Sequence, residues 1–367
     1  MKITCVGKNL KDAIIIAERS TAKNQTLPIL NGVYLEAKNG KLHIRSTNLE
    51  IALEVSIQGK VEKDGVVVVP AKSLGLFISN VGDDAITLQN QKDNLFIKTN
   101  KTETTIKGYP IEEFPLFPKV EAPNHFTISS TVLKDCLSSV VVACSTSDIK
   151  PELSSVFVRL FKNTIKFAAT DSFRLAEKTI VSKTVHADTL VSILIPQKSV
   201  LELTKLLENE GETRVSYSKN QILIEHNSFQ FISRLTEGVF PDYDQIIPKN
   251  FKTEAIAKRT EVVGALRLAG VFVGRLNDVS LKFDHARKKI GLHASNQDVG
   301  EHTSEIDAVV NGEEFSVKYN WRYLMDGMGQ LHSEYSLFSL SGDQTPLLIR
   351  DKADNSFLYL IMPMRGV

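Results

Sequence analysis

Two pairs of adjacent carboxylates are the first residues in this sequence whose type could support chemistry. Asp83-Asp84 and Glu112-Glu113 each lie near turn-forming residues. A carboxylate pair can act as general acid and general base, but adjacent acidic residues near turns are more commonly solvated. We therefore interpret both pairs as solvated turn residues and predict no catalytic residue.

The usual motifs of phosphate, metal and nucleophile chemistry are absent from the sequence. It contains no Gly-x-x-x-x-Gly-Lys-Ser/Thr loop, no His-Glu-x-x-His, no Cys-x-x-Cys and no Gly-x-Ser-x-Gly. Gly327-Met328-Gly329 is too short for a dinucleotide fingerprint, and the eight histidines lack metal-ligand spacing. An enzyme without such a constellation is possible, but the pattern favours a binding or scaffold protein. We expect no metal and no cofactor.

The three cysteines indicate a reducing compartment. Cys5, Cys136 and Cys144 are odd in number and lack metal-like spacing, which fits a cytoplasmic protein better than a disulfide framework. Cys136 and Cys144 fall on an apolar helical pattern, so we interpret both as small core residues. The sequence shows no secretory leader and no apolar segment long enough for a bilayer. We expect a cytoplasmic protein that does not bind a membrane.

Lysine and arginine are the residues through which this chain would contact nucleic acid. Its 367 residues include 44 Lys+Arg and 43 Asp+Glu, so the net charge of +1 decides nothing. Any DNA contact depends on how the cations are distributed. Taken alone, cations on helices fit a solvated surface with a few ion pairs; the other interpretation is that they face phosphates without reading bases. The helical cations are Lys11, Lys72, Lys134, Lys198, Lys205, Arg267 and Arg322.

Six helical patterns must position these cations. In the first, Leu10, Ala13, Ile14 and Ala17 form an apolar stripe, and Lys11 falls outside it. The six patterns run over Leu10–Arg19, Ser73–Val81, Thr131–Ala143, Lys198–Leu207, Thr260–Val273 and Trp321–Met328.

A repeat of about 123 residues organises the sequence. Three strand-like runs lead straight into a helix, and their corresponding positions Pro70, Pro196 and Tyr319 are 126 and 123 residues apart. We expect the prolines in the first helical turn, where a missing N–H has no cost. A second set of similar strand-like runs has the same period: Leu42–Asn48, Ile165–Asp171 and Ile290–Asn296.

Each repeat divides again, because successive helices begin about 60 residues apart. Alternating runs such as Gly32–Ala37, broken by turn residues such as Asn39-Gly40, lie between the helices. One helix followed by several short strands, six times over, predicts an α+β protein with antiparallel sheets and helices on one face. The predicted domains are 1–120, 121–246 and 247–367, and the predicted connectors are Pro110–Pro123 and Phe240–Asn250.

Four segments form a specific pattern in chain order. They are Thr26–Leu30, Ala168–Ala176, Phe240–Pro248 and Leu358–Val367. Together they resemble the bacterial DNA polymerase III beta sliding clamp family. The Met-Pro-Met-Arg ending is the most specific of them, followed by Thr-Asp-x-x-Arg-Leu. The resemblance covers the chain from end to end, including its length and its threefold repeat.

The resemblance implies a DNA clamp fold and a non-catalytic function. Three similar domains per chain, each of two helix-plus-antiparallel-strand repeats, would pair head to tail as a homodimer and form a closed ring with helices lining the hole. The ring would encircle double-stranded DNA independently of sequence and tether a polymerase, which is an effect of local concentration. The implied protein partners are the clamp loader complex, the DNA polymerase III alpha subunit, and other polymerases and repair proteins that carry clamp-binding peptides.

The resemblance also assigns roles to residues. The partner-peptide pocket would comprise Leu153, Thr170, Ser172, Phe173, Arg174, Leu175, Pro241, Ile246, Leu360, Met362, Pro363, Met364 and Arg365. The DNA-facing cations would be Lys11, Lys23, Lys72, Lys134, Lys198, Lys205, Arg267 and Arg322. The dimer seam would join Thr104 and Ile106 of one copy to Val271 and Phe272 of the other. Without the resemblance, the apolar pocket residues would be interpreted as ordinary core.

The chain departs from the family pattern in three places. The family usually has Gly-His where this chain has Ser172-Phe173, and a common Arg is replaced by Gln245. Two further residues, Gly366 and Val367, follow Arg365. Because Phe173 enlarges the apolar wall, we predict an altered peptide preference and not a loss of binding.

Two other classes of protein stay open on the residues alone. A nucleotide- or sugar-processing enzyme built from repeats would need a catalytic cluster, which the sequence does not display. A protein-interaction scaffold without DNA would be a monomer or an open oligomer, insensitive to DNA topology. Retention on circular but not on linear DNA distinguishes a clamp from both.

Overall fold

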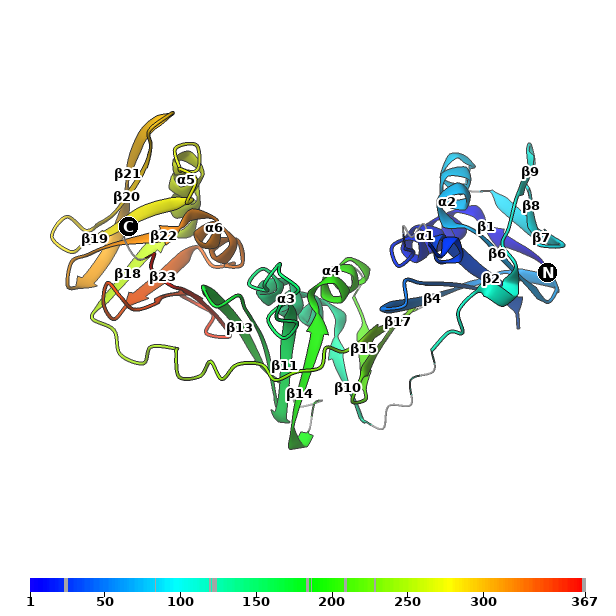
Figure 1. Cartoon of the computed structure of the whole chain (residues 1–367), viewed down its shortest axis with the longest axis horizontal. Helices are drawn as coiled ribbons and strands as arrows, with labels where there is room; N and C mark the ends of the chain where they lie inside the picture. The colour runs from blue at the N-terminus through cyan, green and yellow to red at the C-terminus, as the bar shows by residue number, and fades with distance from the viewer. Residues whose placement is uncertain are drawn as a thin grey trace. The chain divides into compact units, whose positions relative to one another are not determined.

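The computed structural model describes residues 1–22, 26–82, 84–118, 120, 124–182, 185, 187–207, 210–227 and 229–364. The chain forms two compact units (Figure 1). The first unit contains Met1–Lys134 and Leu201–Leu235, and the second contains Asp135–Val200 and Thr236–Val367.

Over the described residues, a strand leads into a helix that is followed by three strands six times along the chain, with one additional strand, β5, after the first helix. This order confirms the predicted repeat. The helices are α1 (Gly7–Glu18), α2 (Ala71–Asn80), α3 (Ser130–Val141), α4 (Gln197–Leu206), α5 (Arg259–Ala269) and α6 (Trp321–Gly329). Each lies within a few residues of its predicted range, except at the end of α5. The predicted stripe of α1 is confirmed, because Leu10, Ala13, Ile14 and Ala17 are all buried.

The prediction that the fifth helix extends to Val273 was wrong. The helix ends at Ala269, and Gly270 lies against the ring of Trp321, whose Nε1 donates to the carbonyl of Leu266 at 2.6 Å. The Leu266 carbonyl also accepts from the N–H of Gly270 at 2.9 Å, so it takes two hydrogen bonds where the helix ends. Val271 and Phe272 consequently lie in the turn that follows.

The first unit is built from two sheets. One has the strand order β5-β1-β7-β8-β9 and the other the order β10-β15-β16-β17-β4-β3-β2-β6. The strands are β1 (Lys2–Val6), β2 (Gly32–Lys38), β3 (Lys41–Thr47), β4 (Ile51–Gln58), β5 (Lys60–Lys63), β6 (Gly65–Pro70), β7 (Ala85–Gln91), β8 (Asn94–Lys98), β9 (Glu103–Ile106), β10 (Asn124–Ser129), β15 (Glu212–Tyr217), β16 (Gln221–His226) and β17 (Phe229–Arg234), with 3₁₀ turns η1 (Pro28–Asn31) and η2 (Ile111–Glu113).

The second unit holds one sheet of twelve strands. Its order is β14-β11-β12-β13-β25-β24-β23-β18-β21-β20-β19-β22. The strands are β11 (Ser155–Lys162), β12 (Thr164–Thr170), β13 (Arg174–Val181), β14 (Ala187–Pro196), β18 (Thr253–Lys258), β19 (Asp278–Asp284), β20 (Lys289–Asn296), β21 (Gly300–Gly312), β22 (Phe315–Asn320), β23 (Tyr335–Leu340), β24 (Leu347–Asp351) and β25 (Phe357–Ile361).

Both predicted sets of repeated strands are confirmed, with one correction. The first set corresponds to β6, β14 and β22, and the second to β3, β12 and β20. Pro70 and Pro196, however, end strands and do not occupy the first helical turn. Pro70 has ψ 118°, an extended conformation, and acts as the N-cap of α2. Proline here closes the strand ladder just before the helix begins.

Strand pairing joins one repeat to the next by the same rule in both units. In the first unit β4 pairs antiparallel with β17, and in the second β13 pairs antiparallel with β25. Each repeat of about 123 residues contains two helices. In both pairs, one strand is the third after the first helix of a repeat, and its partner is the third after the second helix of the next repeat. The sheets therefore continue across the predicted domain boundaries at 120 and 246, and those boundaries stay predictions.

Besides the end strands β5, β6, β10, β14 and β22, which pair with a strand on one side only among the described residues, β9 and the first half of β21 have an unpaired edge. We call the last two the free strand edges. β9 is the last strand of its sheet. In β21, Gly300–Asp307 pairs with β20 only, and Ala308–Gly312 turns to pair with β18. By its place in the repeat, β9 corresponds to β17 and β25. In the same way, β21 corresponds to β4 and β13.

The predictions for the cysteines are confirmed as far as burial is concerned. Cys5, Cys136 and Cys144 are buried and free. Burial raises the pKa of Cys5 to about 11 and those of Cys136 and Cys144 to about 12. All three are consequently protonated, weakly reactive thiols at neutral pH.

No helix of the described chain is long and apolar enough to cross a bilayer. Within the same residues, no group of three or more histidine, cysteine or acidic side chains is placed to hold a metal ion. Of the four acidic residues first considered for chemistry, Glu112 and Glu113 are exposed in η2, and Asp83 lies outside the described residues.

Candidate functional site

A cavity of about 540 Å³ lies in the second unit, beside the C-terminal end of β25. Three segments that are distant in sequence form it: the turn between β12 and β13, the N-terminus of α6, and the residues after β25. Its lining residues are Ser172, Phe173, Asn320, Tyr323, Met362, Pro363 and Met364. We name this cavity the methionine pocket.

A short hydrogen-bonded turn shapes one wall of the methionine pocket. The hydroxyl of Thr170 donates to the carbonyl of Arg174 at 2.6 Å and accepts from the N–H of Ser172 at 3.1 Å. The carboxylate of Asp171 accepts from the N–H groups of Phe173 and Arg174 at 2.9 and 3.0 Å. Serine, threonine and aspartate side chains favour such turns because they bond the local backbone. The result is that Phe173 is held 61 % exposed.

The remaining walls are tied to this turn by main-chain bonds. The N–H of Met362 donates to the carbonyl of Phe173 at 2.8 Å, and the N–H of Met364 donates to the carbonyl of Lys318 at 2.8 Å. Asn320 caps α6, since its side-chain oxygen accepts from the N–H groups of Arg322 and Tyr323. The backbone of the pocket is thus fixed while the methionine side chains keep their rotational freedom.

Arg174 forms the charged support behind the pocket. Its guanidinium pairs with Asp171 at 3.0 Å and with Asp326, and it lies 4.3 Å from the ring centre of Tyr323. Burial alone would lower the pKa of Arg174, but Tyr359, Asp326 and Asp171 raise it above its usual value. Arg174 therefore stays charged, and its position orients Tyr323, one wall of the pocket.

The predicted pocket residues separate into three groups. Ser172, Phe173, Met362, Pro363 and Met364 line the cavity together. Leu175 and Leu360 are paired in register, belong to the core beneath it and are 1 % and 2 % exposed. The others do not line it: Thr170 and Arg174 shape it from behind, Leu153 is buried, Pro241 and Ile246 are exposed on the connector, and Arg365 lies outside the described residues.

Sequence reasoning missed Asn320 and Tyr323. Asn320 precedes a predicted helix, so it was recognisable as an N-cap residue. Its position 148 residues after Ser172 gave no sign that the two line one cavity. Only the pairing of β13 with β25 and the contact of α6 with β22 and β25 bring these segments together.

The cations predicted to face DNA occur at equivalent positions of the helices. Lys72, Lys198 and Arg322 are each the second residue of their helix, and Lys11 and Lys134 are each the fifth. Arg267 lies in the last turn of α5, and Lys205 in the last turn of α4. Lys23 is outside the described residues.

Three of these cations oppose the helix dipole. A positive side chain in the first turn meets the positive end of the helix and does not stabilise it. Lys72, Lys198 and Arg322 are all exposed there, and the one ion pair formed among the described residues is Lys198 with Asp148 at 3.9 Å. Helix stability therefore does not explain the repeated position. An anion supplied from outside would be attracted by both the side chain and the helix terminus.

The predicted seam residues lie beside the two free strand edges. Thr104 and Ile106 are on β9. Phe272 stacks on His302 of β21 at 5.6 Å, and Val271 is 63 % exposed. Leu276 and Val299, which sequence reasoning did not single out, are 61 % and 55 % exposed.

Family models match nearly the whole chain. They are described as the N-terminal, central and C-terminal domains of the DNA polymerase III beta subunit, and they match residues 1–118, 127–242 and 244–365.

Curated relatives and solved structures agree with these matches. A beta sliding clamp of Staphylococcus aureus is 26 % identical over 95 % of this chain and 94 % of its own length. A DNA polymerase sliding clamp from Bacillus subtilis superposes with a TM-score of 0.95 at 26 % identity, covering both chains completely. A sliding clamp from Bartonella birtlesii bound to griselimycin gives a TM-score of 0.94 at 28 % identity, again over the whole of both chains.

The backbone of Ser172 yields a testable prediction. Its φ of 77° is in the left-handed region, which costs a residue with a side chain about 1–2 kcal/mol. Ser172→Gly removes this strain, but glycine also increases the conformational entropy of the unfolded chain, which offsets part of the gain. We therefore expect the free energy of unfolding to rise by about 0.5–1 kcal/mol. In thermal unfolding the midpoint should rise by about 1–3 °C.

Ser172→Ala is the matched control, since it keeps the Cβ and removes only the hydroxyl. Its midpoint should equal that of the unaltered chain. If both variants behave alike, the left-handed backbone is not the source of the effect.

Proposed function

Since the chain belongs to the family of DNA polymerase III beta subunits, the bacterial beta sliding clamps, we propose that two copies close around duplex DNA as a ring. The ring acts as a processivity factor: it holds a DNA polymerase near its template by linkage and needs no reacting group of its own. The observation that carries the ring is the pairing rule of the repeat, which leaves β9 and the first half of β21 as the corresponding strands that are not joined within the described chain.

The repeat specifies how a second copy would pair. Within the chain, β4 pairs with β17 and β13 pairs with β25, so the third member of the series is β21 with β9. A pairing of β21 in one copy with β9 in the other is heterologous, and two such contacts close when the rotation between copies allows it. Exposed strand edges otherwise invite aggregation. The half-exposed side chains of Val271, Leu276 and Val299 supply apolar surface for the same seam.

The helix cations support contact with DNA that is independent of sequence. Lysine and arginine neutralise phosphates and release counterions, a term that carries no base information. Isolated cations on several helices give weak, distributed contacts, which allow sliding. A site that read base edges would hold the ring at one position instead.

The methionine pocket is the proposed docking site for partner peptides. Met362, Met364 and Phe173 provide an adaptable apolar wall, and such walls repack around different ligands. Its proposed ligands are the peptides of the DNA polymerase III alpha subunit, of the clamp loader complex, and of other polymerases and repair proteins. One relative has been solved with a bound ligand, the Bartonella birtlesii clamp with griselimycin.

A retention experiment tests the function. The protein is loaded by a clamp loader onto a nicked circular plasmid and passed through a sizing column. We expect it to elute with the circle and to be lost after one restriction cut, because a ring slides off free ends. Equal retention on linear DNA, or turnover of a nucleotide or sugar substrate by the protein alone, would contradict the proposal.

Phe272→Glu tests the seam. In the proposed seam the second copy would exclude water from the new carboxylate, and removing a charge from water is costly. We expect sedimentation at monomer mass where the unaltered chain sediments as a dimer. Ile149→Glu, at a side chain that is 88 % exposed, is the matched control and should stay dimeric. A Phe272→Glu dimer of unchanged stability would refute this placement.

A fluorescent peptide that carries Gln and Leu-Phe tests the methionine pocket. Met362→Glu places a charge in the apolar cavity and should weaken binding at least tenfold, which corresponds to about 1.4 kcal/mol. Phe173→His should change the ranking among peptides without abolishing binding. If the unaltered chain shows no affinity even at millimolar peptide, the assignment of the pocket fails.

A further inference from the structure

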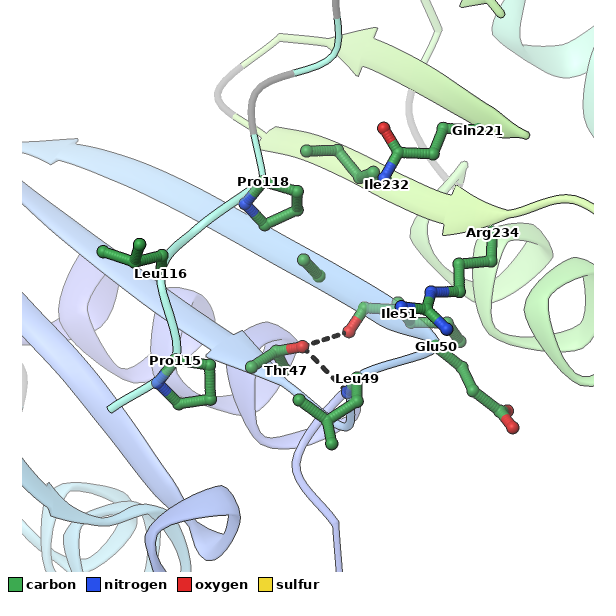
Figure 2. A pocket seen from close by; sticks show the side chains of 11 residues that line it. Thr47, Leu49, Glu50, Ile51, Pro115, Leu116, Pro118, Gln221, Ile232 and Arg234 are labelled. Carbon is green, nitrogen blue, oxygen red and sulfur yellow. Dashed lines mark hydrogen bonds between the residues drawn. The ribbon is translucent and has the colours of Figure 1, made fainter. Parts of the chain in front are cut away.

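A second cavity lies in the first unit at the junction of β4 and β17. It has a volume of about 300 Å³, at the lower end of the usual range for ligand pockets. Figure 2 shows its walls: the turn between β3 and β4, the connector after η2, and the strands β16 and β17. Its lining residues are Thr47, Leu49, Glu50, Ile51, Ala52, Pro115, Leu116, Pro118, Gln221, Ile232 and Arg234. We name it the arginine pocket.

The arginine pocket repeats the architecture of the methionine pocket. The hydroxyl of Thr47 donates to the carbonyl of Ile51 at 2.8 Å and accepts from the N–H of Leu49 at 3.0 Å (Figure 2). These are the bonds that Thr170 makes in the methionine pocket. Leu49 has φ 76°, against 77° for Ser172. Both turns end at the strand pair that joins one repeat to the next, so the two cavities are equivalent by position.

Charge distinguishes the two cavities. In the methionine pocket Arg174 is neutralised by Asp171 and Asp326. In the arginine pocket the neutral Asn48 stands in place of Asp171, and the cation is supplied by Arg234. Arg234 is exposed, and its side chain forms no ion pair with any residue that the structure describes.

The direction of the charged side chains favours an acidic ligand. Figure 2 shows the guanidinium of Arg234 directed toward the other lining side chains, while the carboxylate of Glu50 points away from them. A negative group that enters the cavity therefore meets Arg234 first. The attraction is screened by salt where the pair is exposed, so the charge sets specificity and the apolar walls must supply most of the affinity.

Those apolar walls are unusually open to solvent. Leu116 is 97 % exposed and Leu49 is 49 % exposed. Leu116 and Pro115 also line a neighbouring cavity of about 270 Å³, together with Phe114, Phe117 and the charged Arg45 and Glu112. Single exposed leucines are ordinary, but a leucine that lines two neighbouring cavities links their apolar parts. An extended chain with neighbouring apolar side chains fits such a surface.

We propose that the arginine pocket is a second docking site for partner proteins, and that its occupant is an extended peptide carrying an acidic residue next to apolar ones. The acidic side chain pairs with Arg234, and the apolar side chains cover Leu116 and Leu49. The two pockets of one chain thereby differ in the charge that they favour, because Arg174 is paired with carboxylates and Arg234 is not paired with any among the described residues. A partner with both sequences gains affinity from simultaneous engagement when its linker spans the sites.

Two labelled peptides of otherwise identical sequence test the proposal by fluorescence anisotropy. Fluorescein-Gly-Ala-Asp-Leu-Phe-Ala-amide is compared with the peptide that has Lys in place of Asp. All measurements use the full chain with Met362→Glu, which should weaken binding in the methionine pocket at least tenfold. Binding that remains in the methionine pocket should not respond to substitutions at Arg234 or Leu116, so those variants distinguish the two pockets. We expect saturable binding of the Asp peptide and at least tenfold weaker binding of the Lys peptide.

A charge exchange makes the test specific. Added to that background, Arg234→Glu should weaken the Asp peptide at least tenfold and strengthen the Lys peptide. Leu116→Ser should weaken both, and it cannot disturb the core because the side chain is 97 % exposed. Ile149→Ser, at a comparably exposed side chain of the second unit, is the control and should change neither.

Hydrogen exchange locates the binding. The Asp peptide should protect amides in 47–52 and the amides of Leu116 and Phe117. The proposal is overturned if the Asp peptide does not bind at about 1 mM, or if Arg234→Glu and Leu116→Ser leave its affinity unchanged. It is also overturned if Leu116→Ser alters the sedimentation mass and not peptide binding, because the occupant would then be a second copy of the chain.

Discussion

The backbone hydrogen bonds of two strand edges are the constraint from which this account proceeds. Each N–H and C=O of a strand needs a partner, and a free edge is a template for another chain. Within the chain, neighbouring repeats are joined in the same way at both junctions: the third strand after one helix pairs with the third strand after another. These pairs are β4 with β17 and β13 with β25. The same rule applied once more leaves β21 and β9, and a second copy of the chain can satisfy both. In this account, dimerisation completes the fold.

The tethering function follows from combining a strong seam with weak contacts to DNA. Pairing of strand edges together with burial of Val271, Leu276 and Val299 would make the ring persistent. The helix cations, distributed over α1 to α6, would give electrostatic attraction that depends on salt and not on base sequence. The turns at Thr47 and Thr170 then place two cavities at the two junctions between repeats. The same pattern of strand pairing, repeated along the chain, would thus provide both the proposed ring closure and the proposed docking sites.

The repeat and the helices were predictable because they depend on local periodicity. An apolar stripe such as Leu10, Ala13, Ile14 and Ala17 encodes its helix directly, and Pro70 and Pro196 mark equivalent positions even though they end strands. The end of α5 was not predictable, since it depends on a contact between Gly270 and Trp321. Side chains separated by a long stretch of sequence gave no local signal either.

The sites show the same division. The turn at Ser172 and Phe173 and the ending at Met362–Met364 were recognisable as sequence motifs, and the structure brings them together. The motif could not separate lining residues from supporting ones, so Leu175 and Leu360 were grouped with the pocket although they belong to the core. Asn320 and Tyr323 were missed for the opposite reason: they carry no motif and reach the cavity only through the packing of α6. Family resemblance identifies the motif, and packing decides which atoms a ligand meets.

Hydrogen exchange at the two free strand edges tests the central claim most directly. Outward-facing amides of β9 and of Gly300–Asp307 are followed by mass spectrometry over a dilution series of the pure protein. The account predicts that they are protected at high concentration and lose protection together as the dimer dissociates, while β4 and β17 stay protected throughout. Exchange of β9 and Gly300–Asp307 that is fast at every concentration, in a sample that sediments as a dimer, would contradict it.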